Sequence, residues 1–121
     1  MAIINPTIER SGDGSVLVYT FSGLNSTDTT GAAIPAAEWA DRTVQVTGTF
    51  DTSTVVWEGS NDGTNYVTLT DPQGNACSFT AAGLEQVIEL TQFARPRVTA
   101  GGASTDLTVI ALCRRPNNMR T

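Results

Sequence analysis

The spacing of hydrophobic and polar residues along the chain is typical of β-strands. Residues 43–50 alternate between the two classes, with Val44, Val46 and Phe50 on one face and threonine or glutamine on the other. Successive side chains of a strand point to opposite faces of its sheet, so this pattern indicates a strand with one buried face. A second strand is predicted at residues 15–21, where β-branched and aromatic residues follow a turn rich in glycine.

The middle of the chain predicts a β-hairpin. Residues 54–58 and 66–70 have strand character, and the glycine, asparagine and aspartate residues between them suit a turn with positive φ. After a break at residues 71–75, the same reasoning places four more strands. Their ranges are 76–80, 84–90, 97–100 and 107–114.

About eight short strands at regular spacing predict an all-β fold, an antiparallel β-sandwich or jelly roll. The exception is one long loop, residues 23–40, in which Pro35 and the helix-forming residues after it allow at most one short helical turn. The expected organisation has three parts. They are an N-terminal arm with the first strand (1–10), the β-sandwich domain (11–114) and a C-terminal arm (115–121).

The charge balance narrows the choice of partners. Twelve acidic residues stand against seven arginines and no lysine, for a net charge of −5. Nucleic-acid binding draws its affinity from basic residues, so a nucleic-acid partner is not expected. No apolar stretch approaches the roughly 18 residues of a membrane span, and no export signal is visible, so we expect no membrane partner either.

The chain lacks several of the residue types on which enzyme catalysis most often depends. The chain has no histidine and no lysine, which removes histidine-dependent nucleophiles, histidine metal sites and Schiff-base chemistry. Acidic pairs remain conceivable, but the acids are better interpreted as solvated surface. The turns at 13–15 and 61–65 offer oxygen ligands for calcium, yet side chains that cap their own backbone explain them better. We expect no enzyme activity, no metal and no cofactor.

The cysteine and tryptophan residues each leave alternatives. Cys77 and Cys113 are expected to be small buried apolar residues, although a bridge between them is possible. Trp57 should point into the core. Trp39 lies in the long loop, where it is either an exposed contact or a lid folded back over the sandwich.

Residues 44–50 and 55–69, and more weakly 95–102 and the strand that ends at Arg115, resemble small β-sandwich proteins of tailed-bacteriophage virions. These are the head decoration, or cement, proteins. The resemblance implies a homo-oligomer, dimer or trimer, made in the host cytoplasm and located on the outer capsid surface. Its partner would be the major capsid protein, whose neighbouring subunits it would bridge and stabilise.

In such a role the two arms are the expected contacts. The apolar side chains of the N-terminal arm would bury against a neighbour, and the arginines of the C-terminal arm would pair with its carboxylates. Fraying of both arms is the alternative. With the loop tryptophan, the predicted interface residues are Ile3, Ile4, Pro6, Trp39, Arg114, Arg115 and Arg120.

A second resemblance links residues 59–63 to the hairpin of discoidin-type carbohydrate-binding modules. Such a module would bind a glycan through Trp39 or Tyr66. The chain departs from that family because it is short and lacks a flanking cysteine pair. A tail-associated adhesion protein is the remaining alternative, since one sandwich fold serves several roles.

Overall fold

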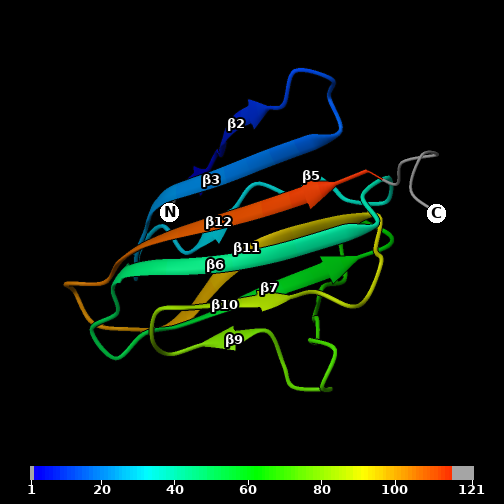
Figure 1. The fold of residues 1–121 in the computed structure, drawn as a ribbon. Helices are drawn as coiled ribbons and strands as arrows, with labels where there is room; N and C mark the ends of the chain where they lie inside the picture. The colour runs from blue at the N-terminus through cyan, green and yellow to red at the C-terminus, as the bar shows by residue number, and fades with distance from the viewer. Residues whose placement is uncertain (1, 116–121) are drawn as a thin grey trace.

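The computed structural model describes residues 2–115, which form two β-sheets packed face to face (Figure 1). This confirms the predicted all-β sandwich. Nearly every strand pair is antiparallel, and the exception is the short parallel pair at the N-terminus. No helix occurs in residues 2–115, so no helix there could cross a membrane.

The five-stranded sheet has the order β10-β6-β12-β3-β2. Its centre is formed by the long strands β6 (Asp41–Thr49), β12 (Asp106–Arg114) and β3 (Val16–Leu24), and β12 pairs with both neighbours over its length. The edges are short: β10 (Gly83–Gln86) and β2 (Thr7–Arg10). These strands match the predicted segments, with β10 shorter than expected.

The seven-stranded sheet has the order β1-β4-β11-β7-β8, with β5 also paired to β11 and β9 to β7. Its centre is β11 (Phe93–Ala100) against β7 (Thr54–Ser60). The predicted hairpin is confirmed as β7 with β8 (Val67–Thr68). The remaining strands are two residues long: β1 (Ile3–Ile4), β4 (Thr30–Gly31), β5 (Ile34–Pro35) and β9 (Ser78–Phe79).

The core lies between the two sheets and is built on alternate residues of the long strands. Phe21 meets Trp57 edge to face, with ring centroids 6.4 Å apart. Trp57, Val44 and Val46 are buried as predicted, and Phe50 packs against the core from its rim. Both cysteines are buried and unbridged, which confirms their interpretation as small apolar residues.

The long loop is more ordered than the sequence suggests. Residues 30–31 and 34–35 add short strands beside β11, and the turn that follows has one hydrogen bond, from the Trp39 N–H to the Ala36 carbonyl at 3.2 Å. Trp39 is only 1 % exposed. The lid alternative is therefore correct for Trp39, and its placement as an exposed contact is wrong, because the large apolar ring closes one end of the core.

The N-terminal segment is part of the sandwich and does not extend from it. β1 pairs with β4 in one sheet, and β2 pairs with β3 in the other, so residues 3–10 cross from sheet to sheet. At the other end, the Arg115 N–H donates to the Ser15 carbonyl at 2.8 Å. The rest of the predicted C-terminal arm, residues 116–121, lies outside the described residues.

Candidate interaction faces

The apolar residues predicted at the N-terminal interface have different environments. Ile3 pairs with Thr30, points away from the core and is 49 % exposed. Ile4 points the other way and packs against the core, and Pro6 is half-buried. Only Ile3 therefore offers a large apolar side chain to a partner.

The predicted C-terminal contacts gather at one end of the sandwich. Arg114 forms an ion pair with Asp41, its neighbour across β6 and β12. The Arg115 guanidinium lies 5.2 Å from the centre of the Trp39 ring and 3.8 Å from Glu38. Arg120 is outside the described residues. Arg114 and Arg115 thus already contact side chains of their own chain.

A cluster that the sequence did not reveal lies on the outer side of the seven-stranded sheet. Glu58 is only 2 % exposed, although it points away from the core. Its Oε2 accepts a hydrogen bond from Arg95 Nε at 2.7 Å, and its Oε1 accepts one from Arg97 Nε at 3.0 Å. The Arg95 guanidinium also lies over the Tyr66 ring, 3.7 Å from its centre.

The strand register explains this cluster. Trp57 faces the core, so the next residue, Glu58, must face outward. Antiparallel pairing places Arg95 opposite Glu58 and Arg97 opposite Val56, on the same side. The same register adds Ile3, Pro35 and Phe93 to that side. We call this outer side of the seven-stranded sheet the arginine face.

The outer side of the five-stranded sheet has a different character, and we call it the neutral face. On β6, β12 and β3 its charged residues stand only at the strand ends, as the Asp41–Arg114 pair and as Asp106. Between them the outward side chains are uncharged and exposed or half-buried. The central ones are Thr43, Gln45, Ile110, Leu112, Val18 and Thr20.

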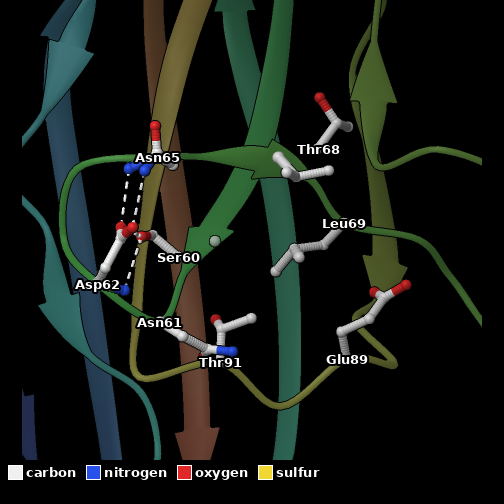
Figure 2. A pocket seen from close by; sticks show the side chains of 10 residues that line it. Ser60, Asn61, Asp62, Asn65, Thr68, Leu69, Glu89 and Thr91 are labelled. Carbon is white, nitrogen blue, oxygen red and sulfur yellow. Dashed lines mark hydrogen bonds between the residues drawn. The ribbon is translucent and has the colours of Figure 1, made fainter.

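A cavity of about 500 Å³ opens between the β7–β8 hairpin and the segment before β11 (Figure 2). Its polar groups are already used by the protein. Asp62 accepts hydrogen bonds from the Ser60 hydroxyl, the Thr64 and Asn65 amides and the Asn65 side chain. These bonds hold the pKa of Asp62 well below its usual range. The hairpin is thus a self-capped turn, as expected.

On the other side of the cavity, the carboxylate of Glu89 accepts hydrogen bonds from the amide and hydroxyl of Thr70. The side-chain oxygen of Asn61 accepts a hydrogen bond from the backbone N–H of Gln92 at 3.1 Å. Within residues 2–115 no three histidine, cysteine or acidic side chains lie close enough together to hold a metal ion. We assign no ligand to this cavity, because these polar side chains already bond to other groups of the protein.

The glycan-binding alternative needs a free aromatic face. Trp39 is buried, and the Arg95 guanidinium covers one face of Tyr66. The geometry therefore does not favour either residue as a stacking platform for a sugar.

Comparison with known proteins gives one informative likeness. No family model and no curated protein matches the chain. Among solved structures, the crystal structure of the SPBc2 prophage-derived protein YomS is similar, with a TM-score of 0.57 and 11 % identity over 81 % of this chain and 93 % of that chain. The two proteins share a fold.

The sequence contained part of the signal for the arginine face. Arg95 and Arg97 are two residues apart in a strand, so they share one side, and the position after Trp57 faces outward. What it lacked was the pairing of β11 with β7, which joins residues 37 and 39 positions apart. Such long-range pairing is not encoded in local periodicity.

Proposed function

We propose that this protein is a non-enzymatic component of a tailed-phage virion that binds the outer capsid surface as a small homo-oligomer and bridges neighbouring capsid subunits. The observation that carries the proposal is the fold shared with the prophage-derived protein YomS over most of both chains. The sequence resemblance to head decoration proteins agrees with it. So does the absence of histidine and lysine, which leaves few routes to catalysis.

Two broad sheet faces suit a protein that joins others. The neutral face spans three nine-residue strands and two shorter ones. At about 3.4 Å per residue and about 4.8 Å between strands, this gives an area of about 600 Å². A stable interface buries about 800 Å² per partner, so the face approaches the required size.

A second copy is the occupant that we propose for the neutral face. The chain has a net charge of −5, so copies repel one another wherever charged surfaces meet. A contact through uncharged threonine, glutamine and aliphatic side chains avoids this repulsion. Packing of the same face on itself would give a two-fold dimer.

Co-sedimentation with capsid shells of the phage that encodes the protein tests the capsid role. We expect saturable binding at a fixed ratio to the capsid subunit. Binding that never saturates, or no binding, would contradict the proposal.

Deletion of residues 1–6 is a poor test of the N-terminal contact, because it removes β1 and exposes the core beside Ile4. Ile3→Asp is sharper, since that side chain is half exposed. It should weaken shell binding without lowering the melting temperature. Val67→Asp makes the same kind of change at another exposed apolar site, in β8, and should bind like the parent protein.

A further inference from the structure

The cluster on the arginine face has two positively charged side chains and only one carboxylate to neutralise them. Two guanidinium groups share the single carboxylate of Glu58, and each uses its Nε for that contact. Both carboxylate oxygens are thereby occupied. Over residues 2–115, the Nη groups of Arg95 and Arg97 make no further hydrogen bond, so their donors stay available.

The two arginines are also held in place before any partner arrives. Glu58 is almost fully buried in a central strand, and Arg95 is stacked on Tyr66 at 3.7 Å. The side chains nevertheless remain accessible, with 27 % of Arg95 and 40 % of Arg97 exposed. An arginine side chain held in this way loses less conformational entropy when its guanidinium group binds a partner than a free surface arginine does.

Apolar side chains border the pair on the same side of the sheet. Ile3 is paired with Thr30, which is in turn paired with Arg97. Phe93 stands two residues before Arg95 in β11 and is paired with Pro35. Arginine among aromatic and aliphatic residues is the composition of protein interfaces.

We infer that the arginine face is a docking site for a partner protein that presents a single carboxylate in a neutral or apolar surround, an aspartate or glutamate side chain that binds the Nη groups of Arg95 and Arg97. Planar guanidinium groups match a carboxylate with paired hydrogen bonds. Ile3 and Phe93 would contact apolar side chains around that carboxylate. This inference goes beyond the capsid role, because it defines the chemistry of the partner whether or not the partner belongs to a shell.

The charges distinguish this partner from two others. A nucleic acid presents many phosphates, and its binding requires many basic residues, whereas this chain has a net charge of −5. A second copy that docked through the same face would place surplus positive charge against surplus positive charge. A single carboxylate in a neutral or apolar surround is complementary to the site.

Binding can be tested on the isolated protein by NMR of the arginine Nε–H groups. The probe is the peptide acetyl-Gly-Glu-Gly-Glu-Gly-amide, added at constant ionic strength beside its glutamine analogue. We expect the Glu peptide to shift the Arg95 and Arg97 signals saturably and the Gln peptide to leave them unchanged. Arg97→Gln should weaken the response about tenfold, because it removes one of the two charged forks.

Two further variants separate docking from folding. Arg97→Lys keeps a positive charge beside Glu58 and preserves the fold, but it lacks the fork and should still weaken binding. Arg10→Gln removes the same charge from the exposed strand β2 and should have no effect. Equal shifts with both peptides, equal weakening by Arg10→Gln, or a stronger response to inorganic phosphate would overturn the assignment to a protein carboxylate.

Discussion

At the scale of single residues, the buried charged groups of Glu58 and Arg42 are stabilised by hydrogen bonds, most of them to residues distant in sequence. Glu58 depends on two arginines of another strand, and Arg42, although buried, donates to the carbonyls of Trp39 and Glu89. A buried charge left without its partner destabilises a fold strongly. Substitutions around Glu58 should therefore reveal how its stabilisation is divided.

Arg95 should contribute more to stability than Arg97. Arg95 is less exposed and stacks on Tyr66, whereas Arg97 is more open to solvent, which weakens its ion pair. We expect Arg95→Met to lower the free energy of unfolding by about 2 kcal/mol and Arg97→Met by about 1 kcal/mol or less. Urea denaturation measures both, and an equal or larger loss for Arg97→Met would refute the ranking.

A hydrogen bond between two carboxyl groups, Asp71 and Glu85, makes stability depend on pH. That bond, and then burial, raise the pKa of Glu85 above its ordinary value of 4.5. Burial raises the pKa of Asp71, but hydrogen bonds from Asn75, Glu85 and Gln73 outweigh it and lower that pKa overall. When the pair binds one proton, Glu85 is therefore the carboxyl that carries it, and its O–H donates to the Asp71 carboxylate.

The raised pKa of Glu85 decides how stability changes with pH. Protonated Glu85 stabilises the folded state fully at pH values below the pKa that Glu85 has in the unfolded chain. This stabilisation is lost as the pH rises through the higher pKa that Glu85 has in the folded state. Glu85→Gln supplies an N–H donor at every pH. Its melting temperature should therefore match the parent near pH 4 and exceed it increasingly toward about pH 7.

Thermal denaturation across that range measures the effect. Gln86→Ala changes an uncharged side chain of the same strand, β10, and its difference from the parent protein should not vary with pH. A constant offset between Glu85→Gln and the parent would rule out the shared proton.

At the scale of elements, local sequence predicted most of the strands and missed the two short ones in the long loop. β3, β6, β7 and β12 are rich in β-branched and other apolar residues over seven to nine positions, enough to predict a strand. β4 and β5 have two residues each and exist because β11 lies beside them. Trp39 was ambiguous for the same reason, since only tertiary packing decides between lid and exposed contact.

One glycine controls how two of these long strands fit together. Gly48 in β6 has φ of +120°, and a Cβ there would lie 2.3 Å from the Asp106 carbonyl oxygen. Gly48→Ala combines backbone strain with a clash against main chain, which cannot move independently of the sheet. We expect it to cost at least about 2 kcal/mol.

Gly12→Ala is the matched control, because nothing lies within 4 Å of the position of its Cβ and its φ is not positive. Chemical denaturation should show a change within about 0.5 kcal/mol for that variant. If Gly48→Ala lowered the free energy of unfolding as little as Gly12→Ala, the close approach of β6 to β12 would not require glycine at this position.

At the scale of the whole molecule, the two outer faces of the sandwich differ, and this gives the protein two directions of contact. On its three long strands the neutral face has charges only at the strand ends, and the arginine face concentrates positive charge on an acidic protein. We propose self-association on one side and, on the other, a partner protein that contributes a single carboxylate. These contacts do not compete, because the core separates the two faces.

Self-association through the neutral face has a direct test. Leu112 lies near its centre and is 40 % exposed, so Leu112→Glu places a charge at the proposed contact without disturbing the core. We expect the parent protein to sediment as a dimer at micromolar concentration and Leu112→Glu to sediment as a folded monomer with the β-sheet circular-dichroism spectrum of the parent. Val67→Glu introduces the same charge at a 69 % exposed apolar residue of the other sheet and should remain dimeric. A monomeric parent protein, or equal dissociation of both variants, would show that copies do not meet through this face.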